Sequence, residues 1–161
     1  DYGGDPNKIV IFGHSAGAHL VSLIGVDTSY LTGRNLPLDV IKGVGSFDTQ
    51  GYDVVSLMND DPSDIYVNAF SNNEDLWEPA SPQRNIGDNP TPPRFFIVTR
   101  GSDKRVSSAN DFHDALENNG YTSQIIDADH YSHGKVNDKI GDPGDKKFMD
   151  EFDRFLEDLF N

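Results

Sequence analysis

Four short apolar segments, each followed by a pattern typical of a helix, recur along this sequence. They cover residues 8–13, 39–47, 93–101 and 121–128. Their β-branched and aromatic residues follow one another without polar alternation, which is typical of strands buried on both faces. Strands that alternate with helices favour a parallel sheet with helices on both sides. We therefore predict an α/β fold in a single domain over residues 1–161.

The helical segments are predicted at residues 16–26, within 60–71, at 107–120 and at 145–160. The last of these has one wholly apolar face, which must pack against something. Its apolar residues recur at helical spacing and are Phe148, Met149, Phe152, Phe155, Leu156, Leu159 and Phe160. Residues 52–93 are otherwise irregular and rich in Pro, Asn and Asp.

The charge balance excludes several classes of partner. The chain has 13 Lys and Arg against 27 Asp and Glu, a formal net charge of −14. Nucleic acids and anionic membranes need a basic face, so we expect neither as a partner. No apolar run approaches the roughly 18 residues that span a bilayer, so we expect a soluble protein and leave its compartment open. There is no cysteine, which excludes disulfides, thiolate metal sites and a cysteine nucleophile.

A Gly-x-Ser-x-Gly string lies between the first predicted strand and the first predicted helix. It consists of Gly13, His14, Ser15, Ala16 and Gly17. A sharp strand-to-helix turn would place Ser15 at its tip, and small residues on either side would avoid collisions with the strand and helix. The Ala16 N–H would then be suited to hold an oxyanion. The alternative is a tight strand–helix packing in which Ser15 only caps the helix.

A serine nucleophile needs a base, and the base needs an acid to orient it. Both should follow later strands, because parallel strands end at the same edge of the sheet. Asp103 follows the third strand and is the favoured acid, with Asp48 and Asp111 as competitors. His130 and His133 both follow the fourth strand, and spacing alone leaves the choice between them open.

Other roles are conceivable for the histidines. His130 and His133 form an H-x-x-H string near Asp127 and Asp129, which is a possible but disfavoured metal site. His14 and His19 are expected to be structural or to line a pocket.

These residues together resemble the α/β-hydrolase superfamily. Within it they are similar to the esterase branch of hormone-sensitive-lipase-like carboxylesterases, arylformamidases and feruloyl-esterase-like enzymes. The resemblance is carried by the stretches "GGDPNKIVIFGHSAGAHL", "SFDTQGYD", "GSDKRV" and "HGKVNDKIGDPGD". In that branch the catalytic histidine commonly begins an H-x-x-[IV]-N-x-x-[IL]-G stretch. His133, Val136, Asn137, Ile140 and Gly141 match it, so the resemblance selects His133 as the base.

The resemblance implies a serine hydrolase that cleaves small or aryl carboxylic esters through an acyl-enzyme, without a cofactor or metal. It implies Ser15 as nucleophile, His133 as base, Asp103 as acid and the Ala16 N–H as oxyanion donor. Residues 52–93 would form walls of the substrate pocket. The candidate substrate-binding residues are His14, Tyr66, Phe70 and Trp77, and core packing is an alternative for the last three.

The resemblance also implies that the chain is the C-terminal half of a longer fold. The family has further strands and an oxyanion loop before the Gly-x-Ser-x-Gly string, so the first strand here would be an unpaired apolar edge. The N-terminal half is then an expected partner, in the same chain or in another. Two alternative functions remain: an amide hydrolase of the arylformamidase type, and a non-catalytic binding protein that keeps the fold.

Overall fold

A parallel sheet of four strands forms the centre of the molecule in the computed structural model, which describes residues 3–60 and 62–161. The strands are β1 (Ile9–His14), β2 (Ile41–Phe47), β3 (Arg94–Thr99) and β4 (Ser123–Asp127), and they lie side by side in chain order. Each predicted strand is present within a few residues of its predicted bounds. The α/β fold class is therefore confirmed.

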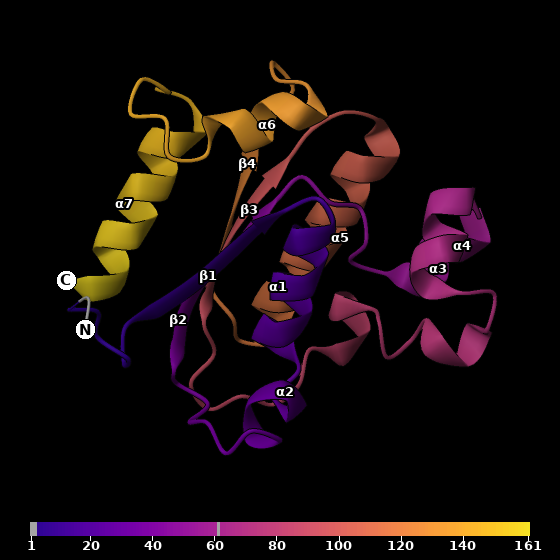
Figure 1. Ribbon diagram of the computed structural model, residues 1–161, viewed down its shortest axis with the longest axis horizontal. Helices are drawn as coiled ribbons and strands as arrows, with labels where there is room; N and C mark the ends of the chain where they lie inside the picture. Colours follow the sequence, from indigo (N-terminus) through magenta and orange to yellow (C-terminus); the bar gives the residue numbers. More distant parts are fainter. Residues whose placement is uncertain (1–2, 61) are drawn as a thin grey trace.

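Helices cover both faces of this sheet (Figure 1). The long helices are α1 (Ala16–Val26), α5 (Asp103–Asn118) and α7 (Phe148–Phe160). Figure 1 shows α7 on one side of the sheet and α1 and α5 on the other. The shorter helices are α2 (Ser29–Thr32), α3 (Val54–Asp60), α4 (Asp64–Phe70), α6 (His133–Lys139) and the 3-10 turns η1 (Glu74–Leu76) and η2 (Pro82–Asn85).

Alternation along β3 divides the core into two layers. Phe95 and Ile97 join the cluster under α1 and α5, whereas Phe96 and Val98 join the cluster under α7. Successive side chains of a strand point to opposite faces, so one apolar strand serves both layers. Most of the predicted apolar face of α7 packs as expected, with Phe148 and Phe152 buried against this second layer, whereas Phe160 is 38% exposed.

Three helical segments differ from the sequence-based expectation. Residues 52–93 contain α3 and α4 as well as η1 and η2, where the pattern predicted a single helix over 60–71. No helix was predicted between residues 26 and 39, where the structure has the short helix α2. No helix was predicted at His133 either, and the structure has α6, which begins at that histidine.

Strand β1 lies at the edge of the sheet, with β2 as its neighbour among the described residues. Two of its apolar side chains are exposed: Ile9 at 37% and Phe12 at 52%. An edge strand with exposed apolar residues is a template for pairing with a further strand. The apolar edge expected from the sequence is therefore present.

Candidate active site

Ser15 occupies the junction between β1 and α1 in a strained backbone conformation. Its φ is 57° and its ψ is −118°, a region that non-glycine residues rarely adopt. Its N–H donates to the carbonyl oxygen of Phe47 at 2.9 Å, which ties the junction to the end of β2. Strain of this kind is maintained only where the surrounding structure enforces it, and here it presents the Ser15 hydroxyl at the sheet edge.

The two glycines around Ser15 differ in whether a side chain would fit at their position. A Cβ on Gly13 would lie 2.5 Å from the carbonyl carbon of Gly17 and 2.6 Å from its oxygen, so no side chain fits there. A Cβ on Gly17 would meet nothing within 4 Å. The steric requirement predicted for both positions holds at Gly13, and at Gly17 the prediction is wrong. The helix turns Gly17 away from β1, so only its backbone makes the close approach.

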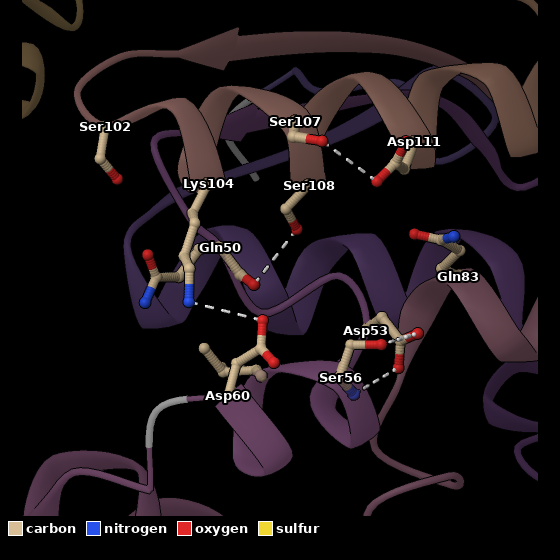
Figure 2. A pocket seen from close by; sticks show the side chains of 11 residues that line it. Gln50, Asp53, Ser56, Asp60, Gln83, Ser102, Lys104, Ser107, Ser108 and Asp111 are labelled. Carbon is tan, nitrogen blue, oxygen red and sulfur yellow. Dashed lines mark hydrogen bonds and ion pairs between the residues drawn. The ribbon is translucent and has the colours of Figure 1, made fainter.

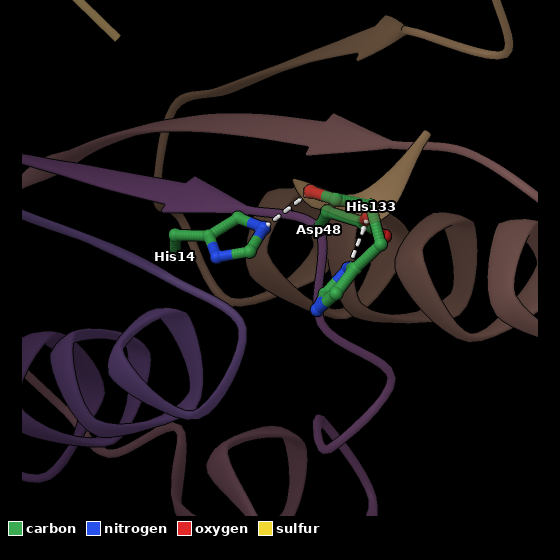
Figure 3. A group of neighbouring side chains, drawn as sticks. All are labelled: His14, Asp48 and His133. Carbon is green, nitrogen blue, oxygen red and sulfur yellow. Dashed lines mark hydrogen bonds and ion pairs between the residues drawn. The ribbon is translucent and has the colours of Figure 1, made fainter. Parts of the chain in front are cut away.

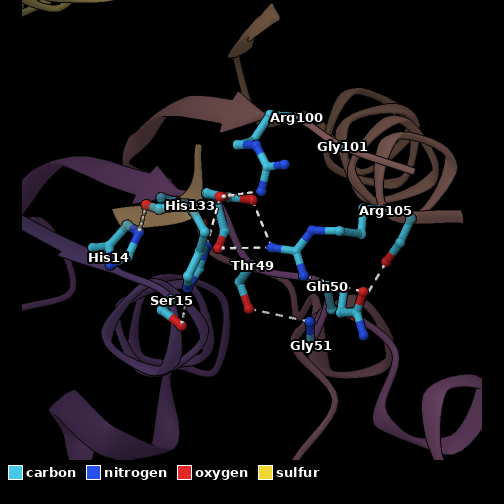
Figure 4. A network of polar contacts seen from close by, with 12 residues as sticks. His14, Ser15, Thr49, Gln50, Gly51, Arg100, Gly101, Arg105 and His133 are labelled. Carbon is cyan, nitrogen blue, oxygen red and sulfur yellow. Dashed lines mark hydrogen bonds and ion pairs between the residues drawn. The ribbon is translucent and has the colours of Figure 1, made fainter. Parts of the chain in front are cut away.

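His133 connects Ser15 to Asp48 (Figures 3 and 4). The Asp48 carboxylate Oδ2 lies 2.6 Å from His133 Nδ1, and Ser15 Oγ lies 3.0 Å from His133 Nε2. A carboxylate can only accept, so Nδ1 carries the proton and donates it to Asp48. In the neutral form of the ring, Nε2 is then the acceptor for the Ser15 hydroxyl. Ser15, His133 and Asp48 thus form one hydrogen-bonded series in which the carboxylate orients the imidazole.

The first turn of α6 places His133 for these contacts. Ser132 caps the helix, and its hydroxyl oxygen accepts from the Lys135 N–H at 3.3 Å. His14 holds the same turn from the opposite side, because its Nε2–H donates to the His133 carbonyl oxygen at 2.9 Å (Figure 3). Burial, followed by the neighbouring His133, lowers the pKa of His14 and so favours its neutral form.

Asp48 is the buried carboxylate of the site. It directly follows β2, its φ is 55°, and its side chain is only 1% exposed. Arg105 Nη2 donates to Oδ1 at 2.5 Å, and Arg100 Nη1 donates to Oδ2 at 3.4 Å. Burial alone would raise the pKa of Asp48, but the hydrogen bonds from Arg105 and His133 outweigh it and hold the pKa below its ordinary value. Asp48 therefore stays ionised beside the imidazole.

Asp103, the acid favoured by the sequence, does not reach His133. It is exposed at the start of α5, where a carboxylate stabilises the helix N-terminus. Asp48 lies in the predicted position instead, because β2 is the direct neighbour of β1 and ends beside Ser15. Arg105, in the first turn of α5, points to Asp48. The sequence alone did not separate the two aspartates, because Asp48 and Asp103 both follow largely buried strands.

A cavity of about 740 Å³ lies over Ser15 and His133. Much of its wall is apolar. Four of the lining residues are large apolar side chains that are exposed to solvent: Leu20, Tyr30, Ile65 and Leu76. Exposed apolar groups gathered at a cavity mark a binding site more than scattered ones do. The segment 52–93 contributes Ile65, Tyr66, Ala69, Phe70, Leu76, Pro79 and Ala80 to the lining.

The predicted substrate-binding residues divide into two groups. Tyr66 and Phe70 line the cavity; the Tyr66 hydroxyl accepts from Gln50, and the Phe70 ring packs on His19. Trp77 does not line it. Its ring belongs to the small core under α3, and its Nε1–H donates to the Ser71 carbonyl oxygen at 2.9 Å.

His14 and Ala16 complete the comparison with the sequence. His14 is not among the described cavity-lining residues, because it is turned toward the backbone of His133. Ala16 does line the cavity and is the first residue of α1. A helix leaves its first N–H groups without an intrahelical acceptor, so the Ala16 N–H is available there.

A second, polar cleft of about 580 Å³ lies between α3 and α5 (Figure 2). The polar groups of its walls bond to one another. Lys104 Nζ lies 3.5 Å from Asp60 Oδ2, and the Ser108 hydroxyl donates to the backbone carbonyl oxygen of Gln50 at 3.4 Å. The lining contains no histidine among the described residues, so it offers no base for a serine. The cleft borders the main cavity at Gln50 and carries no comparable chemistry.

One group of potential metal ligands occurs among residues 3–60 and 62–161, and it is His14, Asp48 and His133 (Figure 3). His130, weighed as a ligand beside His133, is not part of it. Asp48 and His133 already bond to each other, and Arg100 and Arg105 place positive charge on the same carboxylate. These ligand atoms are already hydrogen-bonded and lie beside two guanidinium groups, so they do not fit a metal cation.

No protein-family model and no curated protein matches the chain. Solved structures do match it. An esterase/lipase from an uncultured bacterium is 16% identical with a TM-score of 0.65, over 98% of this chain and 55% of that one. An acetyl ester-xyloside bifunctional hydrolase from Caldicellulosiruptor lactoaceticus is 21% identical with a TM-score of 0.67, over 96% and 58%. A carboxyl esterase 2 from the mycorrhizal fungus Tuber melanosporum is 20% identical with a TM-score of 0.63, over 89% and 50%.

The shared feature is the α/β-hydrolase fold. The parallel sheet and its helices match the corresponding part of these esterases, as the sequence resemblance implied. The chain spans about half the length of the structures that it matches. No helix in the described part of the chain has the length and apolar character needed to cross a bilayer.

Proposed function

We propose that this chain carries the catalytic residues of a serine hydrolase that cleaves carboxylic esters. The proposal rests on one observation: the strained Ser15 is hydrogen-bonded to His133, which is bonded to the ionised Asp48. The apolar cavity above Ser15 suits the acyl or alcohol part of an ester. The esterase names of the structural neighbours support the same reaction class.

In the proposed reaction, Ser15 Oγ attacks the ester carbonyl carbon while its proton passes to His133 Nε2. Asp48 stabilises the imidazolium that forms, and the Ala16 N–H donates to the oxyanion of the tetrahedral intermediate. The intermediate collapses as the C–O bond breaks, and the leaving alcohol takes the proton from His133. Water then attacks the acyl-Ser15 ester with His133 again as base, which releases the acid and restores the serine.

Full turnover, we propose, needs a further part of the fold beside β1. The Ala16 N–H is one donor to the oxyanion, and a second donor is worth about 3 kcal/mol in such sites. The exposed apolar residues of β1 would be covered by an additional strand, supplied by the same polypeptide or by another. We therefore expect the chain on its own to form a covalent adduct at Ser15 but to hydrolyse esters slowly over multiple turnovers.

Reaction with a fluorophosphonate probe tests the proposal. We expect a covalent adduct at Ser15 in the intact mass and in the peptide that contains it. Ser15→Ala abolishes the adduct, and Ser107→Ala, an exposed serine in α5, is the matched control. Absence of an adduct on folded protein would overturn the proposal and favour a non-catalytic binding protein. An adduct with faster turnover of anilides than of esters would favour the amide hydrolase.

A further inference from the structure

The charge of the cavity is opposite to that of the chain. The sequence has 27 acidic residues against 13 Lys and Arg. The lining of the cavity over Ser15 nevertheless contains Arg100 and Arg105 and, within the described part of the chain, no aspartate or glutamate. The other lining residues are uncharged, except that His19 and His133 carry a charge when they are protonated. The positive charge is thus concentrated where the substrate would bind.

Arg105 is held by three hydrogen bonds from its two Nη atoms, although its Nε, like that of Arg100, is buried without a partner among the described residues. Its Nη2 donates to Asp48 Oδ1 at 2.5 Å and to the Asp48 carbonyl oxygen at 3.1 Å, and its Nη1 donates to Gln50 Oε1 at 3.2 Å. These bonds account for the ionised state of Asp48. Arg105 therefore serves as the counter-ion of Asp48.

Arg100 is different, because its guanidinium has little to bond to. Its single described hydrogen bond is a long one, 3.4 Å from Nη1 to Asp48 Oδ2. The same oxygen already accepts from His133 at the much shorter distance of 2.6 Å. The Nε of Arg100 is buried and has no partner among the described residues. Its Nη atoms make this one long bond, against three for the Nη atoms of Arg105, so the Arg100 guanidinium has donors left for an anionic partner.

The charges around Asp48 do not cancel. One carboxylate faces two guanidinium groups, so these three side chains together carry one positive charge in excess. Figure 4 shows both guanidinium groups turned toward the network that contains His133 and Ser15. An excess positive charge repels a cation and attracts an anion, and a planar guanidinium matches the two oxygens of a carboxylate.

We propose that Arg100 binds a carboxylate of the substrate, so that the substrates are esters bearing one carboxylate in addition to the ester group. The inference rests on the proposed function and names its substrate class. Arg100 is linked to Ser15 through Asp48 and His133, so the carboxylate lies several bonds away from the ester carbonyl. The remaining apolar part of the substrate packs between Leu20, Phe70 and Leu76 of the cavity wall.

Paired fluorophosphonates test this directly. The probes share an alkyl tail and differ only at its end, which is a carboxylate in one and the isosteric primary amide in the other; each pair is made with a short and a long tail. The second-order rate of adduct formation at Ser15 is measured for the wild type, Arg100→Gln, Arg100→Lys and Arg154→Gln. Arg154 is an exposed arginine of α7 and provides the matched loss of charge.

We expect the wild type to prefer the carboxylate probe at one tail length by about tenfold to a hundredfold, the value of a charge-assisted hydrogen bond. Arg100→Gln removes the preference, Arg100→Lys keeps part of it, and Arg154→Gln keeps all of it. If Arg100→Gln also displaces Asp48, the rates of adduct formation with both probes fall by the same factor, and the ratio of the two rates does not change.

Three results overturn the inference, and they are distinguishable. Equal rates for both probes at both tail lengths, or a preference that survives Arg100→Gln, refute the carboxylate site and leave the serine hydrolase standing. Absence of any adduct at Ser15 refutes the serine hydrolase and the inference with it.

Discussion

Asp48 and His133, which are 85 residues apart in the sequence, are joined by a hydrogen bond of 2.6 Å between Oδ2 and Nδ1. The bond connects the end of β2 to the first turn of α6 and fixes which ring nitrogen faces Ser15. Because Asp48 is 1% exposed and held by Arg105, the imidazole has a rigid and ionised partner. The orientation of the His133 ring is therefore fixed by a buried residue at the end of β2.

Replacement of this aspartate is the first prediction. Asp48→Asn leaves the shape of the site intact but permits the wrong tautomer of His133, so the rate of adduct formation at Ser15 falls on the order of a thousandfold to ten-thousandfold. Asp103→Asn, at the exposed start of α5, changes that rate by no more than about twofold. Fluorophosphonate labelling kinetics measure both. A large effect of Asp103→Asn with a small effect of Asp48→Asn would reverse the assignment.

The sequence predicted the strands, the strand–helix junction at Ser15 and the apolar face of α7 because each is written in a local pattern. It favoured Asp103, whereas Asp48 is the aspartate bonded to His133, because the order of the strands in the sheet decides which strand ends beside Ser15. Asp48 and Asp103 both follow buried strands, and only the sheet order shows that β2 is the neighbour of β1. Trp77 was equally ambiguous, since an aromatic residue in an irregular segment can face a cavity or a core.

The glycines around Ser15 provide a matched pair of substitutions. Gly13→Ala drives a methyl group into the backbone of Gly17 at 2.5 Å, so we expect a destabilisation of about 1–3 kcal/mol or more. Gly17→Ala meets open space inside α1 and is expected to raise the free energy of unfolding by about 0.5–1 kcal/mol, the helical advantage of alanine. Urea unfolding of both variants measures the difference. Equal effects would show that the backbone at Gly13 and Gly17 is not packed as described.

His19 makes the stability of the folded protein depend on pH. Its ring is 8% exposed, its Nε2–H donates to the Ala80 carbonyl oxygen at 2.7 Å, and burial lowers its pKa. As the pH falls below the ordinary value of about 6.5, the unfolded chain takes up the proton before the folded one does. The contribution of His19 to stability is complete above that pH and is lost as the pH falls through its lower folded-state pKa, by up to about 1.4 kcal/mol per pH unit.

His19→Gln isolates this contribution, because the amide of glutamine can still donate to the Ala80 carbonyl oxygen. We expect urea unfolding between neutral and mildly acidic pH to show a shallower loss of stability in this variant than in the wild type. The pKa of His14 is lowered in the same direction, so some slope remains. His130→Gln, the same substitution at an exposed site, should leave the slope unchanged. Identical slopes in His19→Gln and the wild type would contradict a neutral, buried His19.

The exposed edge of the sheet gives the last prediction. Phe12 projects from β1 with 52% of its surface exposed, while part of its ring packs edge-on against Phe47 and Phe152. An apolar edge strand pairs readily with another copy, and a lysine on the edge opposes that pairing. Phe12→Lys should therefore lower the self-association of the chain on its own, measured by sedimentation velocity. Leu36→Lys adds the same charge at another exposed apolar residue, at 46% exposure, and should change self-association little. If both substitutions act alike, the added charge is responsible; if only Phe12→Lys acts, the β1 edge is the surface that a further strand would cover.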